Sequence, residues 1–216
     1  FILRPQEIPK YVEKGKLDAG ISGDDWIKES RADILEICDL KYAKKKITKV
    51  RWVLAVSKSS KINSIKDLEG KVVSTEIVNI AKDYFKNKNI NNVKIEFSWG
   101  ATEVKPPFFS DAIIDLVETG ESLKVHNLKI LDVVFESSTK LIANKNSWQD
   151  KIKQEKIQEL AILLEGAVRG EEIVGLMMHV SKKKLNKVLK FISTLKEPAS
   201  LKEPTIKKIS DIDWYD

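Results

Sequence analysis

Residues 51–56 read RWVLAV and residues 139–145 read TKLIANK, and these two stretches decide the expected fold. Both are rich in apolar and β-branched side chains, which is typical of buried strands. The chain between them alternates further strand patterns with helical ones, and this order predicts an α/β fold with largely parallel sheets. Because the two strands bracket a central block, we expect two lobes: the chain leaves the first lobe, builds the second and then returns.

Local patterns along the rest of the chain supply the other main elements. Apolar residues three and four positions apart, with turn residues at the ends, predict the helices. In the second helix Asp24 or Asp25 is expected to be the N-cap, and in the last helix Ser181. The longest helix should bury a stripe formed by Ile152, Ile157, Leu160, Leu163 and Leu164. The expected helices cover residues 5–16, 24–34, 77–90, 150–170 and 181–194, and the remaining strands residues 17–23, 72–76, 93–100, 112–117, 125–145 (two strands) and 173–180.

Composition narrows the class of protein. The 216 residues are 42% hydrophobic and 32% charged with a net charge of +6, values that describe a soluble globular protein. No apolar run approaches the roughly 20 residues of a membrane helix, and the lysines are spread along the chain, so we expect neither a membrane nor nucleic acid as a partner. The single cysteine, Cys38, excludes an internal disulfide, and a reducing cytoplasm fits best. The chain starts at Phe1 in what reads like the end of a strand, so we expect the natural N-terminus upstream.

Residues 110–124, SDAIIDLVETGESLK, are the first candidate for chemistry. The apolar run suits a buried strand, Thr119-Gly120 breaks it, and the following residues can start a helix. This order directs several backbone N–H groups at one concavity, where the helix dipole favours a phosphate. Asp115 lies inside the apolar run, where an ionised carboxylate is costly unless it is paired or at the strand end. The alternative is a plain strand and turn in which Asp111 caps an element, and this stretch alone favours that alternative.

Two further segments carry charged residues that can meet a ligand. Residues 100–108, GATEVKPPF, place Glu103 and Lys105 in a loop with glycine and proline, which is alternatively only a rigid connection. Arg4 follows the first strand pattern, where a guanidinium can bind phosphate or stack on a base; alternatively it is a surface cation. The Ser-Ser-Thr run at 137–139 has no histidine partner nearby, so a hydrolase triad is unsupported.

Taken in order, six segments resemble the ATP phosphoribosyltransferase family in its long, histidine-regulated form. They are RPQEIPKYVEKGKLDAGISGDDW (4–26), DLEGKVVSTE (67–76), GATEVKPP (100–107), DAIIDLVETGESLK (111–124), ESSTKLIANK (136–145) and LMMHVSKKKLNKVLKFI (176–192) followed by EPTI (203–206). The resemblance implies two α/β lobes like a type II periplasmic binding protein, followed by a small ferredoxin-like α+β regulatory domain. It implies lobe I at 1–49 and 131–168, lobe II at 50–130, and the start of the histidine-binding domain at 169–216.

The resemblance also implies a reaction. The family joins N1 of the adenine of ATP to C1 of phosphoribosyl pyrophosphate (PRPP) and releases pyrophosphate in the presence of Mg²⁺. Histidine would be the inhibitor, AMP a further candidate ligand, and the assembly a cytoplasmic homohexamer built from dimers. No covalent nucleophile is needed, so catalysis would rest on positioning and charge stabilisation. The resemblance implies that Asp111 and Asp115 are the catalytic pair, which contacts the ribose. It implies that the 5′-phosphate is bound by Thr119, Gly120, Glu121 and Ser122, with Glu103 and Lys105 binding PRPP nearby. Arg4 and Tyr84 would face the nucleotide.

Two other functions stay open on the sequence. A non-enzymatic bilobal solute-binding protein would share the fold but needs no Asp-plus-Thr-Gly loop, and a regulatory partner would keep the fold after losing activity. This chain also departs from the family pattern. The family's N-terminal strand-loop with lysine and glycine is not in it, the regulatory domain is incomplete, and Glu121 adds a negative charge beside the expected phosphate. We expect the Glu121 side chain to point away, so that the backbone binds the phosphate.

Overall fold

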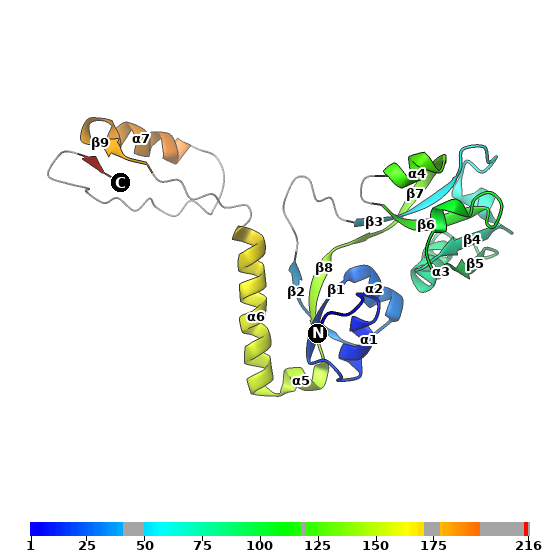
Figure 1. Ribbon diagram of the computed structural model, residues 1–216, viewed down its shortest axis with the longest axis horizontal. Coiled ribbons are helices and arrows are strands. Elements are labelled where there is room, and N and C mark those ends of the chain that lie inside the picture. The colour runs from blue at the N-terminus through cyan, green and yellow to red at the C-terminus, as the bar shows by residue number, and fades with distance from the viewer. Residues whose placement is uncertain (41–49, 118–119, 171–177, 195–213, 216) are drawn as a thin grey trace. The chain divides into compact units, whose positions relative to one another are not determined.

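The chain divides into two units, Phe1–Glu172 and Ile173–Asp216, and each is described by itself (Figure 1). The described residues of the first unit form two separate sheets, and each sheet with the helices packed on it is called a lobe. No helix in the described part of the chain is long and apolar enough to cross a bilayer. The computed structural model describes residues 1–40, 50–117, 120–170, 178–194 and 214–215.

The first lobe is built on a three-stranded antiparallel sheet in which the returning strand β8 lies between β1 and β2. Successive residues of β8 point to opposite faces of the sheet. Ile142 packs with Val12 of α1 and Ile27 of α2, whereas Leu141 and Ala143 pack with residues of α6. The sheet therefore has helices on both faces. The elements are α1 (Ile8–Glu13), β1 (Ala19–Gly23), α2 (Asp24–Ser30), β2 (Leu35–Leu40), β8 (Thr139–Ala143), α5 (Lys145–Gln149) and α6 (Lys151–Gly170).

The second lobe is built on a five-stranded mixed sheet in the order β5-β4-β6-β3-β7. Helix α3 supplies Ile80 and Phe85 to the larger core cluster on one face, which includes Trp52. The short helix α4 supplies Leu123 to the smaller cluster, which includes Ile113. The elements are β3 (Val50–Ser57), η1 (Ile65–Leu68), β4 (Val72–Thr75), α3 (Val78–Asn87), β5 (Lys94–Phe97), η2 (Thr102–Val104), β6 (Ala112–Val117), α4 (Glu121–Val125) and β7 (Leu128–Ser137).

The sequence identified the strands but not their directions. Within the described residues, the only parallel pairs are β4 with β5 and β4 with β6, while β3 runs antiparallel to both β6 and β7. The expectation of largely parallel sheets is therefore wrong. A strand–helix–strand order dictates parallel pairing only where the two strands are neighbours, as β4 and β5 are around α3, and β3 is inserted between β6 and β7.

Three smaller expectations need correction. The lobe boundary placed between residues 130 and 131 falls inside β7, which pairs with β3 along its whole length. The N-cap of α2 is Gly23, because Asp24 and Asp25 lie in the first turn with their carboxylates engaged elsewhere. The apolar stripe of α6 is only partly buried, because one row faces the sheet. That row is Ile157, Ala161 and Leu164, and the exposed apolar residues include Ile152, Leu160 and Leu163.

The described residues of the second unit form a two-stranded antiparallel sheet and one helix. Ser181 belongs to β9 and directly precedes α7, so the helix begins where the sequence predicts it. Most of the strand expected at 173–180 lies outside the described residues. The elements are β9 (Val180–Ser181), α7 (Lys182–Thr194) and β10 (Trp214–Tyr215).

Gly20 is required by the close packing of α1 on β1. A Cβ at this position would lie 2.5 Å from Cγ2 of Ile8 and 3.3 Å from Cγ2 of Val12. Gly20→Ala is therefore expected to lower the free energy of unfolding by about 1–3 kcal/mol through overpacking. Denaturant unfolding measures this loss, and Gly166→Ala in α6 is the matched control. A Cβ at Gly166 meets nothing within 4 Å, so this change should raise stability by about 0.5–1 kcal/mol, and equal losses would contradict the packing argument.

Candidate active site

The candidate site lies where the three strands of the parallel part of the second sheet end. In open α/β sheets, ligands bind beyond the carboxyl ends of the strands. Glu76 directly follows β4, Phe97 is the last residue of β5, and Asp115 lies two residues before the end of β6. Because β4 is parallel to both β5 and β6, these positions lie at the same edge of the sheet. The strand directions therefore place one carboxylate from each of β4 and β6, and an aromatic ring from β5, at the same end of the sheet.

Asp115 and Glu76 are neighbours across two parallel strands. The last paired residues are Thr75 of β4 and Ile114 of β6, and each carboxylate belongs to the next residue. Burial raises the pKa of Asp115 to about 6. The hydrogen bond from the backbone N–H of Leu116, 2.8 Å long, opposes this rise, whereas the negative charges of Glu103 and Glu76 add to it. Asp115 is therefore a partly buried acceptor held among like charges.

The loop expected to hold a phosphate begins at the end of β6. Thr119 lies outside the described residues. Gly120 has φ +77° and is the N-cap of α4, whose first residues, Glu121 and Ser122, are exposed. Leu123 is buried in the smaller core cluster and anchors the loop to the sheet. Because α4 has only five residues, the helix dipole contributes less than expected, and binding by the loop rests on its backbone N–H groups.

Glu103 and Lys105 belong to a tight loop beside β6. Thr102 is buried, and its hydroxyl lies 2.9 Å from that of Ser98, which joins the loop to the end of β5. Glu103 is half-buried in η2, and its charge acts on Asp115. Lys105, the next residue after η2, is also half-buried. Both predicted residues therefore lie in the same region as Asp115.

Asp111 lies at the other end of β6. Its Oδ2 accepts a hydrogen bond of 2.9 Å from the backbone N–H of Val72, and its Oδ1 is 3.7 Å from Nζ of Lys71. Its own N–H donates to the Val72 carbonyl. Asp111 and Asp115 are four positions apart, which is about 13 Å along a strand. The structure therefore does not bring the two aspartates together, and Asp111 ties β6 to the start of β4.

Arg4 lines a cavity of about 590 Å³ beside this edge, within the size range of small-molecule sites. Trp26 from the first lobe and Glu76, Phe97 and Trp99 from the second also line it. The rings of Phe97 and Trp99 meet edge to face with centroids 4.8 Å apart, and Trp99 is 92% exposed. The sequence analysis placed Glu76, Phe97 and Trp99 in strands but did not identify them as residues of a cavity. The signal was a pair of aromatic residues at the end of β5, with Phe97 as the last strand residue and Trp99 two positions further on.

A carboxylate of the first lobe caps the helix that follows Glu76. Glu29 of α2 accepts hydrogen bonds from the backbone N–H groups of Asn79 (2.9 and 3.0 Å) and Ile80 (3.0 Å) at the start of α3. The Asn79 side chain donates back to the Glu29 carbonyl at 2.9 Å. Burial raises the pKa of Glu29, and the backbone hydrogen bonds oppose the rise. The cap therefore joins the two lobes at the wall of the cavity.

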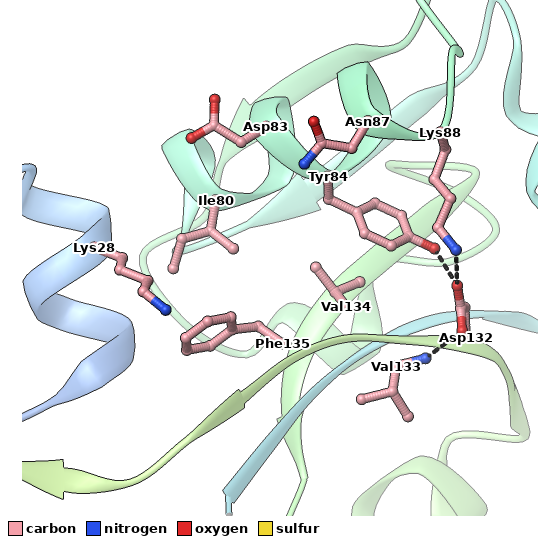
Figure 2. Close-up of a pocket in the computed structure, with 10 residues that line it drawn as sticks. All are labelled: Lys28, Ile80, Asp83, Tyr84, Asn87, Lys88, Asp132, Val133, Val134 and Phe135. Carbon is pink, nitrogen blue, oxygen red and sulfur yellow. Dashed lines mark hydrogen bonds and ion pairs between the residues drawn. The ribbon is translucent and has the colours of Figure 1, made fainter. Parts of the chain in front are cut away.

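Tyr84 lines a different cavity, of about 720 Å³. Figure 2 shows its hydroxyl donating to Asp132 of β7, 2.6 Å away, with Nζ of Lys88 at 3.3 Å from the same carboxylate. This hydrogen bond is the main reason why the pKa of Asp132 is lowered, and burial is the main reason why that of Tyr84 is raised. The two residues expected to face the nucleotide, Arg4 and Tyr84, thus line separate cavities.

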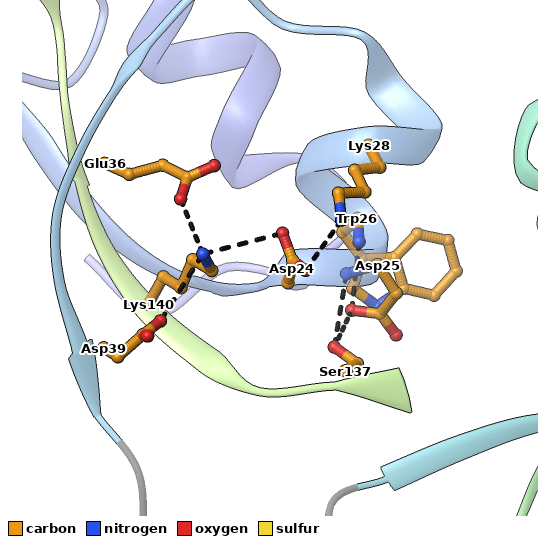
Figure 3. Close-up of polar contacts among 8 residues, drawn as sticks. All are labelled: Asp24, Asp25, Trp26, Lys28, Glu36, Asp39, Ser137 and Lys140. Carbon is orange, nitrogen blue, oxygen red and sulfur yellow. Dashed lines mark hydrogen bonds and ion pairs between the residues drawn. The ribbon is translucent and has the colours of Figure 1, made fainter. Parts of the chain in front are cut away.

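A buried aspartate ties the lobes together where the chain crosses between them (Figure 3). Oδ2 of Asp25 accepts from the indole N–H of Trp52 at 2.8 Å, and Oδ1 accepts from the hydroxyl of Ser137 at 2.8 Å. The backbone N–H of Asp25 donates to the same hydroxyl at 3.2 Å. Asp25 belongs to α2 of the first lobe, while Trp52 and Ser137 belong to strands of the second sheet. This contact was not foreseen from the sequence.

Lys140 of β8 forms a second polar cluster close by. Its Nζ lies 2.5 Å from Glu36, 3.4 Å from Asp39 and 3.8 Å from Asp24 (Figure 3). Burial alone would lower the pKa of Lys140, but the hydrogen bond and the three negative charges raise it. Asp24 also pairs with Lys28 of its own helix at 3.1 Å. These contacts hold α2 against the first sheet.

The fold places the chain among bilobal α/β proteins. The alkanesulfonate-binding protein SsuA from Xanthomonas axonopodis has this fold, with a TM-score of 0.51 and 12% identity over 78% of this chain and 62% of that one. At this identity the likeness shows the fold alone. The relatives with matching sequence are more specific.

Residues 4–166 match the family described as HisG, ATP phosphoribosyltransferase. The curated ATP phosphoribosyltransferase from Thermodesulfovibrio yellowstonii is 48% identical over 100% of this chain, which covers 71% of that protein. The one from Chlorobaculum parvum is 49% identical over 99% of this chain, which covers 70% of that protein. An ATP phosphoribosyltransferase (HisG:HisZ) complex from Thermotoga maritima has a TM-score of 0.67 and 28% identity over 79% of each chain. The chain therefore belongs to the ATP phosphoribosyltransferase family, and the resemblance drawn from its motifs is confirmed. Members of this family are transferases of histidine biosynthesis.

Proposed function

We propose that this chain transfers the phosphoribosyl group of PRPP to N1 of the adenine of ATP and releases pyrophosphate. The observation that carries the proposal is the position of Asp115. It lies two residues before the end of β6 and next to Glu76, which lines the cavity that contains Arg4, inside a sequence that matches the family over most of its length. A solute-binding protein has the fold but needs no acidic strand end of this kind beside a glycine loop.

The PRPP part of the proposed site is the edge formed by β6 and its loop. The backbone N–H groups from Thr119 to Ser122 bind the 5′-phosphate, and the carboxylate of Asp115 accepts hydrogen bonds from the ribose hydroxyls. The charge of Lys105 complements the pyrophosphate group. Glu103 keeps the site negative near C1, where positive charge develops in the transition state. We assign no contact with substrate to Asp111, because its carboxylate is committed to Val72 at the far end of the strand.

The nucleotide part of the proposed site is the cavity that contains Arg4. The guanidinium is an exposed cation suited to the triphosphate, and the faces of Trp99 and Phe97 are suited to the adenine ring. Tyr84 lies outside this site, where its hydroxyl is committed to Asp132. Of the two residues that the sequence analysis assigned to the nucleotide, we therefore keep Arg4 and not Tyr84.

The reaction has a loose displacement as its central step, with cationic character at C1. The residues hold N1 of adenine in line with the bond that breaks, and the carboxylates stabilise the charge at C1. Within the described ranges, no three His, Cys, Asp or Glu side chains are placed to hold a metal. This arrangement fits a magnesium ion that arrives on the pyrophosphate group and keeps several waters, rather than one held in a protein cage. Such an ion supplies charge neutralisation of the leaving group.

Regulation and assembly form a second part of the proposal. The aligned relatives match residues of the second unit as well as the first, since the 48% identity extends over 215 residues. We assign the second unit to a ferredoxin-like regulatory domain that binds histidine, in a cytoplasmic homohexamer built from dimers. The Thermotoga maritima neighbour is a complex with HisZ, so association with a separate regulatory subunit is the alternative. Light scattering and histidine inhibition of the protein purified without partners distinguish the two.

The catalytic proposal is tested by incubating the purified protein with ATP, PRPP and Mg²⁺. We expect phosphoribosyl-ATP and pyrophosphate in equal amounts, measured by chromatography with mass detection. A folded protein that binds ATP or PRPP without forming product would instead support the solute-binding alternative, which the fold of SsuA favours. A folded protein that binds neither substrate but associates with another subunit would support the regulatory one.

A further inference from the structure

In the part of the chain that the structure describes, Glu76 lines the nucleotide cavity and also places its negative charge near Asp115. We propose that Glu76 is a catalytic residue whose carboxylate accepts a proton from the N6 amino group of adenine as N1 bonds to C1 of PRPP. The inference rests on the proposed function and adds to it a residue for the proton that the reaction must release. No side chain in the motifs singled out from the sequence has this task.

The position of Glu76 follows from the register of the sheet. It is the first residue after β4, on the strand next to Asp115. The side chain is half-buried, and its Oε1 lies 3.9 Å from the point that a Cβ would occupy at Gly100. Gly100 has φ +127°, a conformation that favours glycine, so the loop after β5 passes close to the carboxylate. The rings of Phe97 and Trp99 flank this loop on the cavity side.

The chemistry of adenine creates the need for this group. When the lone pair of N1 forms the bond to C1, the electron pair of the breaking C1–O bond leaves with pyrophosphate. The purine then carries a positive charge that N1 shares with the exocyclic N6. Transfer of an N6 proton to the carboxylate leaves the N–H electron pair in the ring system and gives a neutral N1-substituted purine. The proton passes from Glu76 to solvent after the products leave, so atoms and charge balance.

The surroundings of Glu76 suit a proton acceptor. Burial raises its pKa, and the positive charge of Arg4 opposes the rise. A carboxylate whose pKa is shifted toward neutrality accepts a proton more readily than an ordinary one. The ionisable groups that line the cavity with Glu76 are Arg4, Glu7, Lys10 and Glu29 of the first lobe. In the second lobe the charges of Glu76 and Glu103 both act on Asp115.

The aromatic residues supply the orientation that proton transfer requires. Trp99 is almost fully exposed at the cavity, and a base stacked on its indole keeps its edge free for hydrogen bonds. The amino group and N1 lie on the same edge of adenine. A ring placed with this edge toward β4 and β6 therefore presents N6 to Glu76 and N1 to the ribose held by Asp115. Glu76 thus acts on N6 of the adenine, while the neighbouring Asp115 holds the ribose whose C1 is attacked by N1.

The test is Glu76→Gln in the purified protein, with Glu76→Asp as a second variant and Glu69→Gln as the matched control on an exposed loop residue. We expect Glu76→Gln to lower kcat about 100-fold, within the range for general-base groups. The KM values for ATP and PRPP should change less than threefold. Glu76→Asp should retain an intermediate kcat, and Glu69→Gln should equal the unmodified protein.

A pH profile separates a catalytic role from a structural one. Because the ionised carboxylate accepts the proton, kcat at saturating substrates should rise with pH through the pKa of Glu76, and Glu76→Gln should lose this rise. The rise should persist in Asp115→Asn, which removes the other titrating carboxylate. A folded Glu76→Gln protein with kcat within threefold of normal, or with an unchanged profile, would overturn the inference. Absence of product with the unmodified protein would instead overturn the proposed function.

Discussion

Asp115→Asn is expected to lower kcat/KM for PRPP by about 10- to 150-fold without lowering the stability of the free protein. The loss of a charge-assisted hydrogen bond to the ribose costs about 1.5–3 kcal/mol, which corresponds to that factor. The fold loses little, because the carboxylate is held among like charges and burial raises its pKa to about 6. Steady-state kinetics and denaturant unfolding on the same preparation measure the two effects.

The pH dependence of stability gives an independent check. The pKa of Asp115 is raised from 3.8 to about 6, so between these values the folded protein binds more protons than the unfolded chain. The contribution of the protonated side chain is complete below about pH 4 and is lost as the pH rises through about 6. Asp115→Asn should remove this decline from the stability profile. A decline of the same size in the variant would show that Asp115 is not its source.

Asp111→Asn is the matched control on the same strand. Its carboxylate accepts from the Val72 N–H and faces Lys71 rather than the proposed PRPP site. We expect a loss of about 1 kcal/mol in the free energy of unfolding and a smaller change in KM for PRPP than Asp115→Asn produces. A larger kinetic effect from Asp111→Asn would contradict the division of roles between the two residues.

Asp25→Ala is expected to lower the free energy of unfolding by about 3–5 kcal/mol, the largest stability effect among the changes considered. Asp25 is 5% exposed, and its removal leaves the buried Trp52 N–H and the Ser137 hydroxyl without their acceptor. Buried donors without partners carry a large desolvation cost. Denaturant unfolding followed by tryptophan fluorescence measures the effect, because Trp52 reports on the same contact.

Asp83→Ala provides the control for Asp25→Ala. Asp83 pairs with Arg31 at 3.3 Å, but both side chains are more than half exposed, so a loss below about 1 kcal/mol is expected. Trp52→Phe should fall between the two, because it keeps most of the buried ring and removes one donor. A loss for Asp25→Ala no larger than that for Asp83→Ala would show that the lobes are held together by other contacts.

The sequence predicted the elements well because apolar periodicity and turn residues act locally. It could not distinguish Asp111 from Asp115, since both flank or interrupt the same apolar run. Their difference depends on which end of β6 meets the ends of β4 and β5, and strand direction is a property of the assembled sheet. The expectation for Glu103 and Lys105 came from a family motif, and the structure places both residues beside β6.

The contact between the lobes was beyond local reasoning for a different reason. Asp24 and Asp25 stand where N-caps usually stand, and capping is the commoner meaning of that pattern. Partners 27 and 112 residues away, Trp52 and Ser137, use the Asp25 carboxylate instead. Long-range hydrogen bonds thus outweigh a local preference worth about 1 kcal/mol. Trp99 and Glu76 were overlooked because each falls inside an expected strand, 93–100 and 72–76, where no local pattern marks a residue as part of a cavity.

The cap that Glu29 places on α3 makes lobe separation observable. The backbone N–H groups of Asn79 and Ile80 donate across the lobes to this one side chain, so they lose their acceptor whenever the lobes part. Their rates of hydrogen exchange should therefore report the frequency of opening, while amides deeper in α3 report the unfolding of the helix. ATP bound across the cavity should slow exchange at Asn79 and Ile80 first. The hydrogen-exchange rates of these two amides therefore measure how often the lobes open, without any label or substitution.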